Sequence, residues 1–119
     1  MPRPGRYFLS DQPWHVIQRG NNRAPVFFGG EDFELYRAWL RAAAHEHGCA
    51  VHAYVLMTNH VHRMVTPRAA DSLPRTMQSL GRRYMRHVNA TYRRTGTLWQ
   101  GRYRAAPIDS DADFLACCR

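Results

Sequence analysis

Lysine is absent from this chain of 119 residues, and all 17 of its basic side chains are arginines. No apolar run approaches the roughly 20 residues that a membrane-spanning helix requires. No apolar signal segment follows the N-terminal residues, so we expect a cytoplasmic protein with no membrane partner. The three cysteines form no Cys-x-x-Cys pair, which argues against a disulfide framework and against a zinc ribbon.

Acidic residues are absent between Asp71 and Asp109, a segment that holds eight arginines, and the formal net charge of the chain is +8. A GC-rich coding sequence favours arginine over lysine in any protein, but it does not explain this one-sided block. Such a block is either a solvated basic face or a surface for a polyanion. Because arginine grips phosphate oxygens in pairs and stacks on bases, the distribution predicts nucleic-acid binding.

Hydrophobic periodicity predicts a single α+β domain over residues 1–119, a length that suits one sheet-and-helix core. Its βαββαβ order is that of ferredoxin-like and RNA-recognition-like (RRM-like) folds. There, two helices cover one face of a four-stranded antiparallel sheet whose first and third strands are central. The pattern predicts strands at 14–19, 49–57, 60–66 and 98–108, helices at 31–47 and 72–94, and a C-terminal helix from 111 that is cut short at 119.

The segment Asn59-His60-Val61-His62 places two imidazoles one residue apart after an apolar run. Alternate side chains of a strand share a face, so both rings point the same way and Val61 points into the core. Such a pair binds transition ions and, with added oxygen ligands, Mg or Mn. Two histidines on a half-solvated strand are the alternative. His15 is a candidate third ligand if it shares their face, although a structural histidine is commoner.

Three ordered segments resemble the REP-associated tyrosine transposases, which are HUH single-tyrosine nucleases related to insertion-sequence transposases. They are residues 15–23 (HVIQRGNNR), 54–62 (YVLMTNHVH) and 96–103 (GTLWQGRY). The resemblance implies cleavage and strand transfer of single-stranded or hairpin DNA. It assigns His60 and His62 to catalysis as ligands of a Mg or Mn ion. In this family a helical tyrosine attacks a DNA phosphate, which gives a 5'-phosphotyrosine and a free 3'-OH.

The chain departs from this family at two places. It ends where relatives continue into a Tyr-Ile-x-x-Asn-Pro sequence that carries the nucleophile, so we expect it to bind DNA without cleaving it. A trimmed enzyme and a decayed copy are both consistent with that end. Tyr84, Tyr92 and Tyr103 are expected to have other roles. Arg63 stands where relatives carry an aliphatic residue, and it is expected to face the helices and to reach an edge or an acid.

DNA contacts are expected from basic, amide and aromatic side chains of the first turn, the long helix and the last strand. Arginines would follow the backbone, and aromatic rings would stack on unpaired bases. The candidates are Arg19, Asn21, Asn22, Arg23, Arg82, Arg83, Arg86, Arg93, Arg94, Trp99, Arg102, Tyr103 and Arg104. Core packing is an equal alternative for Trp99.

The function expected from these residues is a metal-dependent tyrosine DNA endonuclease and transposase that lacks its nucleophile. The alternative is a non-catalytic single-stranded nucleic-acid module of RRM type, in which the histidines are incidental. We expect a monomer or a weak homodimer, the latter through apolar Phe114 and Leu115.

Overall fold

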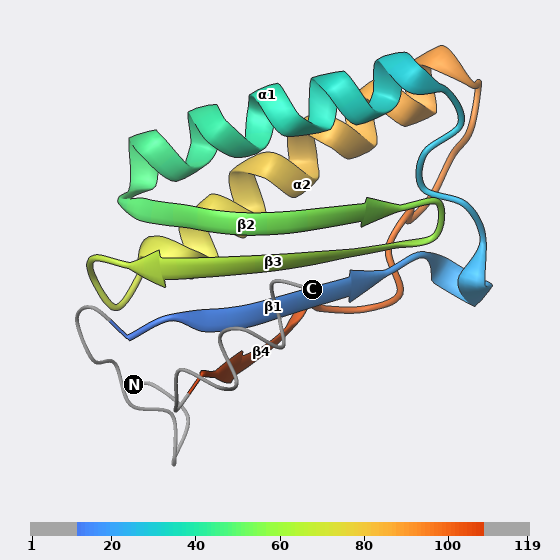
Figure 1. Ribbon diagram of the computed structural model, residues 1–119. Helices are drawn as coiled ribbons and strands as arrows, with labels where there is room; N and C mark the ends of the chain where they lie inside the picture. Colours follow the sequence, from blue (N-terminus) through green and yellow to red (C-terminus); the bar gives the residue numbers. More distant parts are fainter. Residues whose placement is uncertain (1–11, 109–119) are drawn as a thin grey trace.

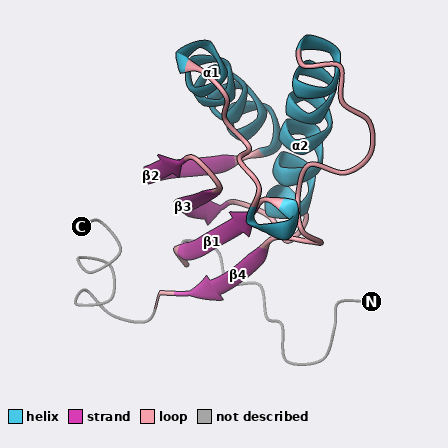
Figure 2. Ribbon diagram, turned by 90° about the vertical axis from the view of Figure 1, so that its right-hand side faces the viewer, coloured by secondary structure: helices cyan, strands magenta, loops and turns pink. Residues whose placement is uncertain are grey.

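A computed structural model describes residues 12–108 as four strands and two α-helices joined by short connections. The strands form one antiparallel sheet with both helices on the same face (Figures 1 and 2). This confirms the predicted α+β architecture. In chain order the elements are β1 (Trp14–Arg19), the 3₁₀ turn η1 (Asn21–Arg23), α1 (Gly30–His47), β2 (Cys49–Met57), β3 (His60–Pro67), α2 (Ser72–Thr91) and β4 (Arg104–Pro107). The sheet order is β2-β3-β1-β4, so β3 and β1 are central, as predicted.

The helices cover the sheet with side chains that recur at helical spacing. Glycine ends α1, because Gly48 adopts a left-handed conformation (φ 82°) and its amide donates to the Ala44 carbonyl. Neither helix in the described part of the chain has the length and apolarity that crossing a bilayer requires. The buried helical side chains include Tyr36, Leu40 and Ala43 of α1 and Leu73, Met77, Leu80, Tyr84 and Val88 of α2.

The tight hairpin predicted before the histidine pair is present. Met57 is the register partner of His60, so only Thr58 and Asn59 lie in the turn. From His60 onward, successive side chains of β3 point to alternate faces of the sheet. The turn therefore sets which side of the sheet His60 and His62 occupy.

The last strand is shorter than predicted. β4 spans Arg104–Pro107, whereas the sequence pattern favoured 98–108. Gly96 and Gly101 have positive φ angles of 85° and 63°, which interrupts an extended backbone. Trp99 makes only an isolated bridge to Gly20. The helix α2 also ends at Thr91 rather than at Arg94, and the C-terminal helix predicted from residue 111 lies outside the described residues.

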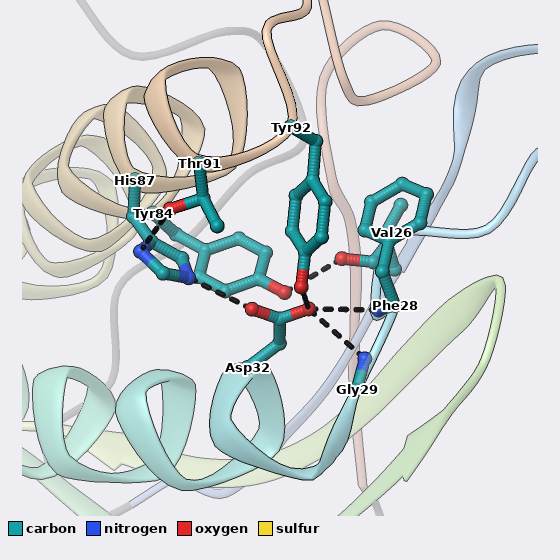
Figure 3. Close-up of polar contacts among 8 residues, drawn as sticks. All are labelled: Val26, Phe28, Gly29, Asp32, Tyr84, His87, Thr91 and Tyr92. Atoms are coloured by element: carbon teal, nitrogen blue, oxygen red, sulfur yellow. Dashed lines mark hydrogen bonds and ion pairs between the residues drawn. The ribbon is translucent and has the colours of Figure 1, made fainter.

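A buried carboxylate joins the start of α1 to the end of α2 (Figure 3). Asp32 is fully buried and accepts hydrogen bonds from the backbone amides of Phe28 and Gly29, from His87 Nε2 and from the Tyr92 hydroxyl, at 2.7 to 3.1 Å. Burial alone would raise the pKa of Asp32, but the bonds from His87, Tyr92 and Phe28 and the charge of His87 lower it below its usual value. The ionised carboxylate therefore stabilises this corner of the fold.

Arg63 is on the helix side of the sheet, as alternation predicts, but it reaches neither an edge nor an acid. Its side chain is 1% exposed. Its Nε and Nη2 donate to the Tyr36 hydroxyl at 3.0 and 2.7 Å, and Nη2 also donates to Gln18 Oε1 at 3.2 Å. The expectation was wrong because Tyr36, from α1, supplies a neutral oxygen inside the core that replaces water as the acceptor.

Candidate metal and nucleic-acid site

The two histidines of the pair lie together on the face of the sheet that the helices leave open. Val61 and Arg63, which alternate with them along β3, are 0% and 1% exposed beneath the helices. His60 and His62 are half-buried, and their ring centroids are 5.0 Å apart at a near-perpendicular angle of 76°. This is the geometry that strand alternation predicts for a His-x-His segment.

Each imidazole of the pair is held by a hydrogen bond at Nδ1. His60 Nδ1 lies 2.8 Å from Asn59 Oδ1, and His62 Nδ1 lies 2.9 Å from His15 Nε2. An amide oxygen only accepts, so His60 carries its proton on Nδ1 and keeps the lone pair of Nε2 for a ligand. Such outer contacts usually orient the histidines that bind metals.

The electrostatic surroundings of His62 favour its neutral form. Burial lowers the pKa of His62 first, and electrostatic interactions with His15, His60, Arg19 and Arg63 lower it further. A neutral imidazole has the lone pair that a metal ligand requires. The surroundings of His62 therefore favour the form of its ring that can bind a cation.

The pair fits a divalent ion as part of a coordination shell but not as a complete one. Within residues 12–108, no group of three or more histidine, cysteine, aspartate or glutamate side chains is arranged to hold a metal ion. His15 shares the face of the pair, but its Nε2 faces His62 Nδ1. We therefore place His15 behind the pair rather than as a third ligand. Oxygen from water or phosphate suits the remaining positions for Mg or Mn.

Two arginines flank the pair on the same face. Arg19 of β1 is the register partner of His60, and Arg104 of β4 is the partner of Ile17, which itself lies opposite His62. Directly opposed residues of an antiparallel pair share a face. Both arginines are exposed. Their side chains therefore border the position that a phosphate bound at the histidines would occupy.

The turn η1 adjoins this site through the hairpin turn. The Gly20 amide donates to the Asn59 carbonyl at 2.9 Å, and Asn59 Nδ2 donates to the Arg23 carbonyl at 3.4 Å. Asn21, Asn22 and Arg23 are all exposed. These three predicted DNA contacts therefore lie next to the residue that orients His60.

The arginines of α2 lie across the sheet from the histidines. Figure 2 shows α2 on the face of the sheet opposite to the open one. Arg82, Arg83 and Arg86 of this helix are exposed. The Arg83 guanidinium stacks on Trp39 with 4.6 Å from Cζ to the ring centroid. Arg93 and Arg94 follow the end of α2, and Arg94 lies over Phe28 at 5.6 Å. The structure thus separates the predicted DNA contacts into two groups.

The two aromatic candidates pack inward. Trp99 is half-buried against the main core cluster, with its ring centroid 6.4 Å from those of both Tyr36 and Tyr84. Tyr103 packs against the second cluster, which contains Val16. Arg102 lies over the Tyr103 ring at 5.3 Å and remains exposed. Trp99 therefore packs against the core, while its contact with DNA, and that of Tyr103, stay predictions.

The five tyrosines among residues 12–108 make their contacts away from the histidine pair. Tyr36 and Tyr84 are buried in the core, and burial raises the pKa of Tyr84 well above its usual range. Tyr54 lines a cavity of about 290 Å³ with side chains of α1. Tyr92 donates to the buried carboxylate of α1, a bond that raises its pKa. Tyr103 packs on the helix side of the sheet, against the cluster that contains Val16. The described residues therefore place no phenol beside the pair.

Sequence reasoning did not identify two contributors to the site, the orienting residue Asn59 and the flanking position of Arg104. Asn59 immediately precedes the pair at the hairpin turn, and that position is a signal that could have identified it. The place of Arg104 depends on the register between β1 and β4, which no local pattern provides.

Comparison with known proteins supports the same assignment of fold. A family model described as "Transposase IS200 like" matches residues 9–116. A solved REP-associated tyrosine transposase bound to a REP hairpin is similar at a TM-score of 0.75 and 16% identity, over 99% of this chain and 68% of that chain. A protein from Deinococcus radiodurans R1, provisionally described as a transposase, is similar at 0.68 and 20%, over 97% and 92%. No curated protein sequence matches the chain.

Proposed function

This chain belongs to the family of IS200-like transposases, and from that premise we propose that its open sheet face binds single-stranded or hairpin DNA for metal-dependent cleavage and strand transfer. The observation that carries the proposal is the pair His60 and His62 on the uncovered face, bordered by Arg19 and Arg104. The solved relative is bound to a REP hairpin. That complex supports hairpin DNA as the partner.

The chemistry of phosphodiester cleavage matches these side chains. A Mg or Mn ion bound by His60 and His62 would neutralise charge on the phosphoryl oxygens. Arg19 and Arg104 would hold the flanking phosphates by charge-assisted hydrogen bonds, and so fix the strand across the sheet. Asn59 would keep His60 oriented throughout. Each of these roles concerns binding and orientation rather than nucleophilic attack.

The nucleophile of the reaction comes, in this proposal, from outside residues 12–108. A phosphotyrosine intermediate needs a phenol in line with the scissile bond, and the described tyrosines point elsewhere. We therefore expect none of the five tyrosines among residues 12–108 to form a covalent adduct with DNA. A DNA-linked peptide that carries the modification on one of these five tyrosines, identified by mass spectrometry, would contradict this expectation.

The remaining DNA contacts follow from the two faces of the sheet. Asn21, Asn22 and Arg23 would extend the path of the single strand past the hairpin turn. The stem of a hairpin would lie against the basic side of α2 and the segment that follows it. That second group comprises Arg82, Arg83, Arg86, Arg93, Arg94 and Arg102. We propose that the protein binds DNA in the cytoplasm. We also propose that it does so as a monomer or a weak homodimer.

Mn-dependent DNA binding tests the proposal directly. Binding of a hairpin with a single-stranded flank is measured by fluorescence anisotropy with Mn²⁺ and with EDTA. Wild-type protein should bind about tenfold more tightly with Mn²⁺, which corresponds to about 1.4 kcal/mol. The variant His60→Ala/His62→Ala should lose this difference, because it lacks both nitrogen ligands.

The matched control is His45→Ala, which removes an exposed imidazole from α1 and should keep the Mn²⁺ effect. The alternative function, a non-catalytic RRM-type binder, predicts equal affinity with Mn²⁺ and with EDTA for all three proteins. Equal affinities in wild type would therefore reject the metal-dependent function and favour that alternative.

A further inference from the structure

His15 is placed to control which nitrogen of His62 carries the proton. It lies on β1 two residues before Ile17, the register partner of His62, so the two rings are diagonal neighbours on the open face. Their planes differ by 8° with ring centroids 5.1 Å apart, and His15 Nε2 lies 2.9 Å from His62 Nδ1. A single hydrogen bond between these two nitrogens therefore links the side chains of β1 and β3.

The proton of this hydrogen bond has two positions with opposite consequences for metal binding. If His62 Nδ1–H donates to His15 Nε2, the neutral His62 ring keeps a free lone pair on Nε2. If His15 Nε2–H donates instead, neutral His62 carries its proton on Nε2 and has no lone pair left for a cation. The direction of one hydrogen bond therefore decides whether His62 is a ligand.

The neighbouring histidine shows the same arrangement with an unambiguous direction. Asn59 Oδ1 accepts from His60 Nδ1 at 2.8 Å, which leaves Nε2 of His60 free. A pair that binds one ion through two Nε2 atoms requires the matching arrangement at His62. Among the described residues, His15 is the side chain that hydrogen-bonds to the His62 ring.

We infer that His15 is a positioning residue: it accepts the Nδ1 proton of His62 and so presents His62 Nε2 to the cation. This inference rests on the proposed function, because it assigns His15 a purpose only if His60 and His62 bind a metal. It also replaces the direct-ligand role that the sequence suggested for His15. The His15 ring then carries its own proton on Nδ1, and no net charge is added to the site.

Two measurements test the role of His15, and one of them needs no metal. Long-range ¹H–¹⁵N NMR spectra of the metal-free protein report the tautomer of each imidazole. Titration with Mn²⁺, followed by the EPR signal of the free ion, reports its affinity. His15→Ala should move His62 toward the Nε2–H tautomer and weaken Mn²⁺ binding by about 10- to 100-fold.

His15→Gln should restore both properties, because its Oε1 can reach the place of the missing Nε2 acceptor. His45→Ala serves as the control and should change neither. If His15→Ala does not fold by circular dichroism, His15→Phe replaces it, since phenylalanine keeps the ring and lacks the acceptor.

The inference is overturned if the acceptor-free variant keeps the His62 tautomer and the Mn²⁺ affinity of wild type, or if His15→Gln behaves like that variant. Failure of the proposed function is a separate result, in which wild-type protein does not bind Mn²⁺. In that case the tautomer spectra still decide whether His15 orients His62.

Discussion

At the scale of single residues, Arg63 poses the sharpest energetic question. Its guanidinium is always charged, is almost fully buried, and hydrogen-bonds to neutral oxygens of Tyr36 and Gln18. Burial raises the pKa of the Tyr36 hydroxyl more than the charge and hydrogen bonds of Arg63 lower it, so Tyr36 stays neutral. A buried cation held only by neutral oxygens is costly, and an apolar replacement of similar volume is often neutral or stabilising.

A double-mutant cycle on this contact should therefore be strongly non-additive. Arg63→Met alone leaves the Tyr36 hydroxyl unpartnered and should lower the free energy of unfolding by about 1–3 kcal/mol. Tyr36→Phe alone strands the buried guanidinium and should cost more. The double variant should be at least as stable as Arg63→Met. Urea unfolding followed by circular dichroism gives all four values, and a double variant less stable than either single variant would contradict the argument.

The same residue marks the limit of prediction from sequence. Strand alternation was enough to place His60 and His62 outward and Arg63 inward, because parity depends only on neighbours in the chain. The partner of Arg63 could not be predicted, because Tyr36 lies on α1 and reaches β3 only through tertiary packing. The same holds for His15, whose contact with His62 requires the register between β1 and β3.

At the scale of elements, Asp32 couples the two helices, and its ionisation makes that coupling depend on pH. The folded-state pKa of Asp32 is below its usual value, so its contribution is present above the unfolded pKa and is lost as pH falls through the folded one. We expect Asp32→Asn to lose about 1–3 kcal/mol at pH 7, because an amide cannot accept four donors. The acid limb of its stability curve should also be flatter than in wild type.

Thermal unfolding between pH 3 and pH 7 measures both effects. Glu31→Gln is the matched control, since it removes a neighbouring exposed carboxylate from the same first turn of α1. The control should keep the wild-type acid limb. If Asp32→Asn and wild type lose stability in parallel as the pH falls, the carboxylate does not have the assigned role.

Elements with continuous periodicity were predicted well, and the one without it was not. Both helices and the first three strands agree with the pattern, because their apolar residues repeat at one spacing over many positions. The segment from Leu98 to Tyr103 also reads as a strand, but Leu98 is 2% exposed in the main core and Gly101 turns the backbone. Tertiary burial of Leu98 and Trp99 thus overrides the local preference for an extended chain.

At the scale of the whole molecule, the sheet divides the basic residues into a histidine side and a helix side. Arg19 and Arg104 belong to the first, and the arginines of α2 belong to the second. Single-stranded DNA bound at the histidines would contact only the first group, whereas a hairpin would also reach the second. The net charge of the sequence, +8, gives no indication of this division, because the two groups of arginines are separated only when the sheet forms.

The dependence of DNA affinity on salt should separate these two groups. Removing one phosphate-binding side chain reduces the slope of log Kobs against log salt by about 0.7 for a single strand and by about 0.9 for a duplex. Arg19→Ala and Arg104→Ala should therefore reduce the slope for an unpaired oligonucleotide by about 0.7 each, whereas Arg82→Ala/Arg86→Ala should reduce it only for the hairpin. Arg41→Ala, on α1, is the control and should change neither slope. An equal reduction for both DNA forms in the α2 variant would mean that the single strand also crosses the helical face, and that the open face is not the principal binding surface.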